Sequence, residues 1–384
     1  MHPAKRQPVP GTGPYRIDGF TPNLSIRLVR NPHFREWSHA AQPAGFPDEI
    51  VGEVKPVREQ PEALRIRGQK KRIALVEHGD ADLTSSHGAV PFFPFVSAPF
   101  RPWIHRHPNP TTFYLAFNTE RPPFNDPRAR QAVNYALDRD KVVRLSAGED
   151  ADQPTCQVLP PNFPGYRRYC PYTLPSADGT WTAPDPARAA RLAAASGTKG
   201  TPVTLWVPRD PAGIRLGRYL EDLLGSLRYR VHLRSSFKER LDTKTHEPCS
   251  TSTRRCRWRE SVGAYFLGVP RKPRATPQIL WGGWAADFPA ASNFIAALFS
   301  CREDNLAHFC DPALDRHIGR ALRLQQTDPG GAKRLWTELD REITDRALWV
   351  PLYSVYGADL VSRRVGNYRH HSMKGALLSQ LWVR

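Results

Sequence analysis

The sequence lacks any run of about eighteen consecutive apolar residues, the length that a helix needs to cross a bilayer. We therefore expect no membrane-spanning segment. The first thirteen residues, MHPAKRQPVPGTG, carry basic side chains, but no apolar stretch follows them. They do not have the pattern of a secretory signal peptide.

Motifs of the common catalytic sites are also missing. The chain has no Gly-x-Ser-x-Gly nucleophile elbow, no His-Glu-x-x-His helix and no glycine-rich phosphate loop. The stretch GTGPYR does not fit a dinucleotide motif, because Pro14 and Tyr15 lead into a predicted strand instead of a helix. We expect a protein that is not an enzyme, with no catalytic residue and no cofactor.

The composition is that of a folded globular protein. The chain has 384 residues, of which 40% are hydrophobic and 10% aromatic. This is enough to bury the cores of two or three domains, and it argues against wholesale disorder. The 38 Pro residues predict many short elements joined by ordered connections.

The chain is strongly basic, with a formal net charge of +18. Such a balance can indicate a nucleic-acid partner. Here the Arg residues are scattered through every segment, and the densest basic run, residues 253–259, lacks a recognition helix. We expect an Arg-rich solvated surface and no nucleic-acid partner.

The six Cys residues fall into three pairs of near neighbours. The pairs are Cys156 with Cys170, Cys249 with Cys256, and Cys301 with Cys310. An even number suits disulfides in an oxidising compartment, and each pair could close a local loop. The pair of Cys249 and Cys256 could equally be two free thiols. Zinc needs closer Cys pairs or His partners at set spacing, so we expect no metal.

Four predicted helix starts share an Asp followed directly by Pro. The carboxylate accepts free N–H groups of the first turn, while Pro has no N–H and a preset φ. The starts are Asp126-Pro127, Asp185-Pro186, Asp311-Pro312 and Asp328-Pro329. Apolar residues at helical spacing follow three of them, and the stripe after Pro127 reaches Val143.

Short apolar runs rich in β-branched and aromatic residues predict the strands. They cover residues 26–29, 73–76, 113–117, 203–207, 229–233, 279–284 and 350–353. A helix predicted over 213–227 lies between two of these strands, which makes a βαβ unit with a parallel crossover. The pattern therefore predicts an α/β fold.

The most unusual segment covers residues 281–312. Asp287 is the lone charge between Gln278 and Cys301. A charge in apolar surroundings needs a partner, which could be a cationic group on a ligand. The alternative is an Asp that caps the next helix. Trp281 and Trp284 fall on opposite faces of the predicted strand, and we favour Trp284 for a ligand and Trp281 for the core.

Six segments together carry a family resemblance. They are GTGPYRIDGFTPNLSIRLVRNPHF, YLAFNTERPPFNDPRARQAVNYALDRDKVV, LPPNFPGYRRYCPYTL, GWAADFPAASNFIAALFSC, FCDPALDRHIGRAL and ALWVPLYSVYGADLVSRRVGNY. In content and order they resemble the family 5 extracellular solute-binding proteins, the dipeptide/oligopeptide-binding receptors of ABC importers. Several motifs in the same order are specific evidence for a family, whereas one motif alone would not be.

The resemblance implies a bilobal, periplasmic-binding-protein-like type II fold. It also implies truncation at the N-terminus, because GTGPY lies well inside the family's chains and here begins at Gly11. We expect a partial first lobe over 1–112, a second lobe over 113–348 and a return segment over 349–384. An irregular insertion, about 235–259, would interrupt the second lobe. The two crossings would be hinge strands.

The resemblance also indicates the site residues. Asp287 would hold the amino group of a bound peptide, and Trp284 would line the cleft beside it. The pairing of Cys301 with Cys310 agrees with a disulfide of the family. Asp80 and Asp82 in HGDADL resemble the family's acidic turn before a cleft-lining loop, with hydroxyls following at Thr84, Ser85 and Ser86. A plain exposed turn explains them equally well.

Several histidines raise the question of a metal site. They are His105, His107, His370 and His371. Adjacent histidines on a strand would point to opposite sides. We therefore expect surface histidines.

The primary hypothesis is the solute-binding component of an ABC importer, which captures an oligopeptide-like solute between two lobes and presents it to permease subunits. The alternatives are a truncated chain that no longer binds, a ligand-sensing module and, least favoured, a basic nucleic-acid binder. The family works at the extracellular face of the cell membrane or in the periplasm. The missing signal pattern argues against export of this chain as it stands. The sequence does not specify the ligand, because one scaffold serves many.

Overall fold

A computed structural model gives the fold of most of the chain. The described residues are 11–22, 24–40, 43–53, 62–86, 92–146, 148–149, 151–175, 178–208, 210–235, 238–242, 256–260, 277–301 and 305–384. The chain forms two compact units, one reaching to His107 and resuming over Gly357–Arg384, and one over Pro108–Tyr356. The units change after His107 and after Tyr356, and the expected lobe limits near Thr112 and Leu348 stay predictions.

The first unit begins with an antiparallel sheet. Its strands β1 (Tyr15–Thr21), β2 (Ser25–Arg30) and β3 (Glu49–Glu53) follow one another in the order β1-β2-β3. The Arg27 guanidinium lies across the sheet, 2.6 Å from Glu49 and 2.7 Å from Asp18. All three side chains are partly solvated, so these ion pairs add little to stability.

Helix α1 and short strands complete the first unit. Helix α1 covers Glu62–Glu77, and β4 (Leu83–Ser85) pairs antiparallel with the end of the long strand β12 (Trp349–Val361). Short helical turns follow at η1 (Phe93–Phe95) and η2 (Ala98–Trp103). The C-terminal part has η4 (Leu378–Gln380) and the strands β13 (Val365–Gly366), β14 (His370–His371), β15 (Gly375–Ala376) and β16 (Trp382–Val383). Of these, β13 pairs with β16 and β14 with β15.

The strand predicted over 73–76 is wrong, since these residues lie inside α1. Ile73 and Val76 are each 1% exposed and pack with Ala358 and Leu360 of β12. With the fully buried Gln69 they form an i, i+4, i+7 stripe along one helix face. A short apolar run alone does not distinguish a buried helix from a strand.

A mixed sheet organises the second unit. Its strands run in the order β12-β5-β11-β7-β8, and β6 (Asp152–Pro154) pairs with β12. Strand β11 (Ile279–Ala285) is antiparallel to β5 (Ile104–Phe117) and parallel to β7 (Pro202–Trp206). Helix α5 (Pro211–Ser226) connects β7 to the parallel strand β8 (Arg230–Arg234). The predicted βαβ unit and the α/β class are therefore confirmed.

Each face of this sheet carries its own apolar core. The α5-side cluster includes Leu115, Phe117, Leu205, Leu216, Leu220, Trp281, Val350 and Leu352. The α9-side cluster, named after helix α9 (Pro329–Asp345), includes Tyr114, Ala116, Phe294, Leu298, Trp336, Leu339 and Trp349. Side chains of β5 alternate between the two, as the pleat requires.

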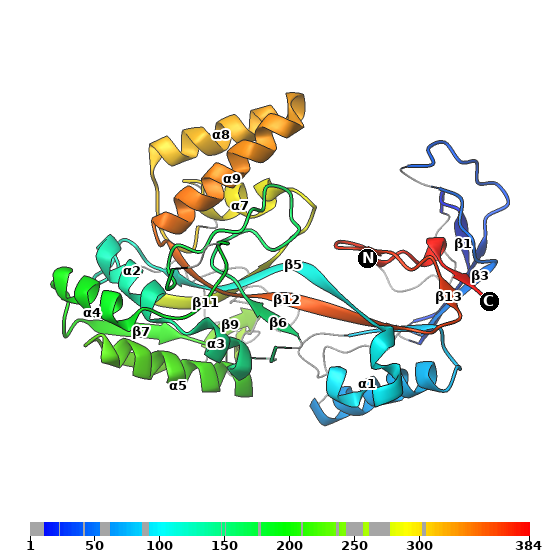
Figure 1. Ribbon diagram of the computed structural model, residues 1–384, viewed down its shortest axis with the longest axis horizontal. Helices are drawn as coiled ribbons and strands as arrows, with labels where there is room; N and C mark the ends of the chain where they lie inside the picture. Colours follow the sequence, from blue (N-terminus) through cyan, green and yellow to red (C-terminus); the bar gives the residue numbers. More distant parts are fainter. Residues whose placement is uncertain are drawn as a thin grey trace. The chain divides into compact units, whose positions relative to one another are not determined.

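Helices cover both faces. The α5-side cluster draws residues from α2 (Pro127–Ala136), α3 (Arg139–Leu145), α4 (Pro186–Ala195) and α5. The α9-side cluster draws residues from η3 (Ala291–Asn293), α7 (Ile295–Phe299), α8 (Pro312–Thr327) and α9 (Pro329–Asp345). In Figure 1, α8 and α9 lie side by side above β5 and β11, and α5 lies below β7. Among the described helices none has the length and apolar character to cross a bilayer.

All four predicted Asp-Pro starts are confirmed. In each helix the Asp carboxylate accepts a backbone N–H of the first turn. A fifth pair, Asp210-Pro211, starts α5 in the same way, so this helix begins before the predicted Gly213. The stripe predicted to reach Val143 is two helices, because the chain leaves the helix at Leu137 and Asp138 caps α3.

A buried carboxylate ties α9 to the connection before α4. Asp340 is 1% exposed and accepts hydrogen bonds from Gln157 Nε2 at 2.6 Å and from the N–H groups of Val158 and Leu159 at 3.0 and 3.3 Å. Burial raises the pKa of Asp340 to about 7, against the opposing effect of these donors.

The predicted insertion at about 235–259 lies largely outside the described residues. What the structure describes there and just beyond is β9 (Lys238–Asp242) paired antiparallel with β10 (Cys256–Glu260). Cys249 is outside the described residues, as is the side chain of Cys256. Their pairing stays an open prediction.

Candidate functional site

Strand β11 ends directly before the candidate ligand-binding residue Asp287. Its two tryptophans point to opposite faces, as predicted: Trp281 is 6% exposed in the α5-side cluster, and Trp284 packs against the α9-side cluster. The glycines between them make room for aromatic rings of β5. A Cβ on Gly282 would come within 2.7 Å of the Tyr114 ring. The WGGW motif is thus a packing requirement of this strand pair.

Asn293 joins Trp284 and Asp287 into one hydrogen-bonded group. Its Oδ1 accepts from Trp284 Nε1 at 3.1 Å and from the backbone N–H of Asp287 at 2.9 Å. Its Nδ2 donates to Asp287 Oδ2 at 3.2 Å. Asn293 is 4% exposed, so its amide is fixed by the packing around η3. The turn after β11 therefore holds the Asp287 carboxylate in a set orientation.

The helix-cap alternative for Asp287 is wrong. Neither η3 nor α7 has a side-chain cap, and their N-cap positions are Ala290 and Phe294. The expectation that Asp287 lies in apolar surroundings is also wrong, because Asp287 and the adjacent Phe288 are exposed at this turn. Among the described residues no Lys, Arg or His forms an ion pair with Asp287. An accessible carboxylate without a cation is able to accept one from a ligand.

Sequence reasoning missed Asn293. Its signal was a polar pair, Ser292-Asn293, placed in an apolar stretch six residues after Asp287. Asn is a residue that satisfies donors and acceptors together, and a buried one needs several partners. That requirement could have linked it to the nearby carboxylate and indole.

The acidic turn HGDADL lies in the first unit. Asp82 Oδ1 is 2.9 Å from Arg364 Nη2, so its charge is already paired. Asp80 is exposed, and Thr84 is buried in β4. The Ser86 hydroxyl accepts the N–H of Ala358 at 2.8 Å. The turn is exposed at Asp80, as the alternative of a plain exposed turn expects, whereas Asp82 and Thr84 are held by contacts within the first unit.

Two predicted disulfides are confirmed. Cys156 and Cys170 form a bridge with their Cα atoms 4.9 Å apart, and Cys301 and Cys310 form one with 4.7 Å between the Cα atoms. The second bridge closes the segment between α7 and α8. It therefore lies on the same side of the sheet as Asn293.

The histidines are not all separate surface residues. His105 is exposed and lies against Tyr368, with ring centroids 4.3 Å apart. His107 and His370 instead stack on each other, with centroids 3.4 Å apart and an interplanar angle of 15°. Burial lowers the pKa of His370, and the neighbouring His107 lowers it further.

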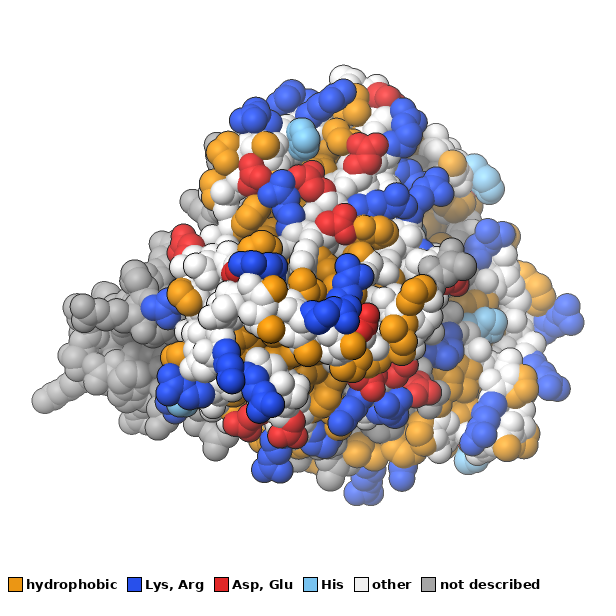
Figure 2. Space-filling model, turned by 60° about the vertical axis from the view of Figure 1, so that its left-hand side comes forward, with side chains coloured by type: hydrophobic (Ala, Val, Ile, Leu, Met, Phe, Trp, Pro, Cys, Tyr) orange, Lys and Arg blue, Asp and Glu red, His pale blue; other side chains and the backbone are white. Residues whose placement is uncertain are grey.

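On one face of the molecule, charged side chains of both signs are mixed (Figure 2). Figure 2 shows one face on which Lys and Arg are interspersed with acidic and hydrophobic side chains, with no single basic stripe. On this face of the described residues (Figure 2), such a distribution gives no continuous track for a phosphate backbone. The expectation of an Arg-rich solvated surface fits this view.

Comparison with known proteins places the chain among solute-binding proteins. It matches the family model of bacterial extracellular solute-binding proteins, family 5 Middle, over residues 3–305. It is 23% identical to the periplasmic oligopeptide-binding protein OppA of Salmonella typhimurium over 358 residues, 93% of this chain and 57% of that protein. It is 26% identical to the probable di/tripeptide-binding protein 5 of Pseudomonas aeruginosa over 374 residues, 94% of this chain and 59% of that protein.

Solved structures share the fold. The clavulanic acid biosynthesis oligopeptide binding protein 2 superposes with a TM-score of 0.73 at 19% identity, over 97% of this chain and 63% of that one. The periplasmic binding protein DppA of Helicobacter pylori, in complex with the peptide STSA, superposes with a TM-score of 0.57 at 18% identity. It too is covered to 63%, so this chain spans less than two thirds of the length of these proteins.

The mixed α/β fold and the ordered motifs agree with these matches. The family match extends over most of the 384 residues. The chain belongs to the bacterial extracellular solute-binding proteins of family 5, a family of non-enzymatic binding proteins.

Proposed function

We propose that this chain binds an oligopeptide-like solute and presents it to the permease of an ABC importer. In this proposal Asp287 accepts the terminal ammonium group of the peptide, and Trp284 packs beside the first residue. The observation that carries the proposal is the exposed Asp287 carboxylate, held by Asn293 and without a cationic partner among the described residues.

The hydrogen bonds of Asn293 support a binding role for this carboxylate. They occupy Asp287 Oδ2 and the Asp287 backbone N–H, which fixes the side chain before any ligand arrives. A preoriented acceptor loses less conformational entropy on binding than a free one. Charge-assisted hydrogen bonds from an ammonium group to a carboxylate are also stronger than neutral ones.

The relatives point to the same class of solute. The proteins from Salmonella typhimurium and Pseudomonas aeruginosa carry names that specify oligopeptides and di/tripeptides. The Helicobacter pylori structure holds a four-residue peptide, STSA. These names favour a peptide solute for this chain.

Capture between two lobes belongs to the same proposal and rests on the family resemblance. The proposal also includes the expected lobe limits, the return segment that completes the first lobe, and placement outside the cell membrane or in the periplasm. These points rest on the same resemblance. Desolvation on closure and pairing with the peptide backbone would supply affinity beyond the Asp287 contact.

Binding of small peptides tests the proposal. Titration calorimetry of the 384-residue chain with a mixed panel of di- to pentapeptides should show saturable binding with one site per chain. The same peptides acetylated at the amino terminus should bind more weakly, because they lack the cation. If no free-amine peptide binds while the protein unfolds cooperatively, the alternative of a chain that no longer binds is favoured instead.

A further inference from the structure

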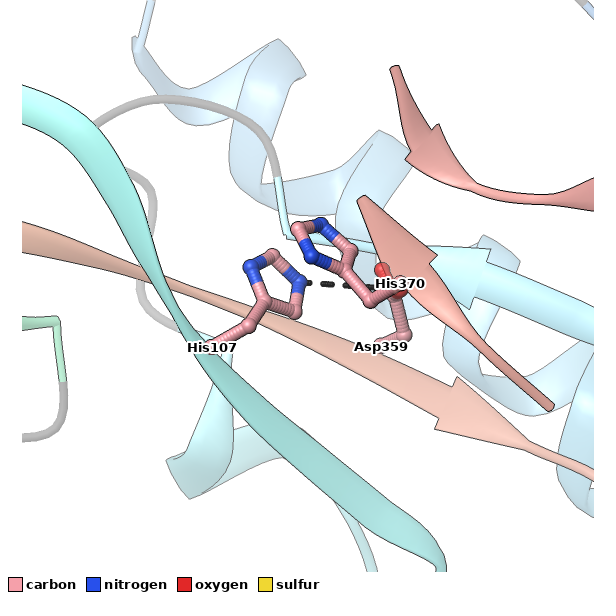
Figure 3. A group of neighbouring side chains, drawn as sticks. All are labelled: His107, Asp359 and His370. Carbon is pink, nitrogen blue, oxygen red and sulfur yellow. Dashed lines mark ion pairs between the residues drawn. The ribbon is translucent and has the colours of Figure 1, made fainter. Parts of the chain in front are cut away.

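Three side chains with metal-binding atoms meet in the first unit. They come from β5, β12 and β14, and Figure 3 shows His107, Asp359 and His370 turned toward one another. One ligand atom of each residue lies within 4.8 Å of the other two. His107 and Asp359 are more than 250 positions apart in the sequence, and the fold alone brings them together.

The cluster is largely removed from solvent. The side chain of His107 is 14% exposed and that of Asp359 is 2% exposed. The atoms His107 Nε2 and Asp359 Oδ2 are 3.6 Å apart, which is too long for a hydrogen bond. Within the part of the chain that the structure describes, neither ring nitrogen of His107 has a hydrogen-bond partner. Buried polar atoms of this kind are costly unless something binds them.

The carboxylate is held by neighbouring hydroxyl groups. Tyr368 Oη donates to Asp359 Oδ2 at 2.5 Å, and the Ser85 side chain also hydrogen-bonds to Asp359. Carboxylates that ligate metals are usually oriented by such outer hydrogen bonds. The surroundings therefore fix Asp359, while in the described part of the chain the His107 nitrogens have no hydrogen bond of normal length.

We propose that His107, Asp359 and His370 form a binding site for a divalent transition metal ion of the Zn²⁺ type. Two imidazole nitrogens and one carboxylate oxygen are ligands that Zn²⁺ accepts, and a fourth position stays open to water or another group. Neighbouring ligands of a tetrahedral ion at about 2.1 Å lie about 3.4 Å apart. The observed 3.6 Å between His107 and Asp359 is close to that spacing.

One local adjustment completes the site. The two rings stack almost in parallel, whereas the lone pair of an imidazole nitrogen lies in the plane of its ring. A rotation of the His370 ring about its χ2 angle would turn a nitrogen toward the shared point. His370 lies in the two-residue strand β14, which pairs only with β15, so this ring is the easier one to move.

The next residue provides a matched control. His371 follows His370 in β14 but its Nδ1 accepts the N–H of Met373 at 3.1 Å. It is outside the group of atoms that converge on Asp359. His370→Ala and His371→Ala remove the same side chain from adjacent positions. A difference in metal affinity between the two variants would therefore report a specific site.

A metal titration tests the site. The untagged 384-residue chain is stripped with a chelator and titrated with Zn²⁺ against a chromophoric competitor, and separately with Co²⁺ by visible absorption. We expect one tight equivalent in the wild type and in His371→Ala. In His370→Ala and His107→Ala the affinity should fall at least about tenfold. Equal affinity in the wild type and His370→Ala, or no saturable site in the wild type, would overturn the proposal.

A second readout guards against variants that fold poorly. Because an ion that binds only the folded state raises its stability, Zn²⁺ should raise the thermal midpoint of the wild type and His371→Ala. It should not raise that of His370→Ala, whose far-UV circular dichroism shows whether it is folded. An equal rise in all three proteins means that Zn²⁺ binds elsewhere, and the assignment to this cluster is then wrong.

Discussion

Asn293 contacts Asp287 through both atoms of its amide: Oδ1 accepts the Asp287 backbone N–H at 2.9 Å, and Nδ2 donates to Asp287 Oδ2 at 3.2 Å. The same Oδ1 accepts Trp284 Nε1. An amide offers a donor and an acceptor on one flat group, whereas an ionised carboxylate of the same size only accepts. The orientation of the Asp287 carboxylate thus depends on one buried residue.

Replacing Asn293 with Asp should destabilise the fold. The variant keeps an acceptor for the two N–H donors but loses the Nδ2 donor and places a second carboxylate beside Asp287. We expect a loss of about 1–3 kcal/mol in the free energy of unfolding, measured with urea. Ser292→Ala, at the adjacent buried position, is the control and should lose less. Equal stability of Asn293→Asp and wild type would mean that the hydrogen-bonded group is not formed in solution.

Removing the bridge between Cys301 and Cys310 should destabilise the second unit. The bridge spans nine positions, so in the chain-entropy account its loss costs about 2–3 kcal/mol. We expect the double variant with Ser at both positions to unfold at lower urea concentration than the oxidised wild type. Mass spectrometry after alkylation without reductant checks that the bridge is present. If the wild type alkylates at both residues, the pairing is refuted.

Local chemistry accounts for what the sequence predicted well. An Asp before a Pro satisfies N–H groups within one turn, so four helix starts could be located without knowing the rest of the fold. The parallel β7-α5-β8 unit follows from element order, and each disulfide joins near neighbours in the sequence. These features depend on short stretches of chain.

What the sequence did not reveal depends on tertiary contacts. Ile73 and Val76 form a short apolar run that is typical of a strand, but they lie on the buried face of α1. Asn293 bonds to Asp287 because the turn after β11 places the two residues side by side. The contact of His107 with His370 joins β5 to β14, and no local sequence pattern predicts it.

The stability of the protein should depend on pH through Asp340. Burial raises the pKa of this carboxyl to about 7 in the folded protein, whereas an Asp in an unfolded chain titrates near its ordinary value of about 4. Between these values the folded state binds more protons than the unfolded state. The contribution of Asp340 to the free energy of unfolding is therefore present in full below about pH 4 and is lost as pH rises through about 7.

Comparison with Asp340→Asn isolates this effect. The variant does not titrate at this position, so the difference in unfolding free energy between wild type and variant should fall as pH rises from 5 to 8. Each pKa unit of the shift corresponds to about 1.4 kcal/mol. Urea unfolding at several pH values gives the difference directly. A difference that stays constant with pH would mean that Asp340 keeps an ordinary pKa, with the three N–H donors outweighing its burial.

Asp287→Asn should weaken the binding of peptides with a free amino terminus and leave acetylated peptides nearly unaffected. The size of the loss is informative, because Asp287 is exposed in the free protein. If the bound peptide and the surrounding chain exclude water, losing one partner of the ion pair costs about 2–5 kcal/mol. If water remains, the pair is worth no more than about 1 kcal/mol. Calorimetry on the two proteins with the two peptide forms gives the coupling energy.

Asp222→Asn, an exposed site on α5, is the matched control and should bind both forms like the wild type. Equal losses for free and acetylated peptides would assign Asp287 to the structure of its turn, and the cation-binding group would then be another residue.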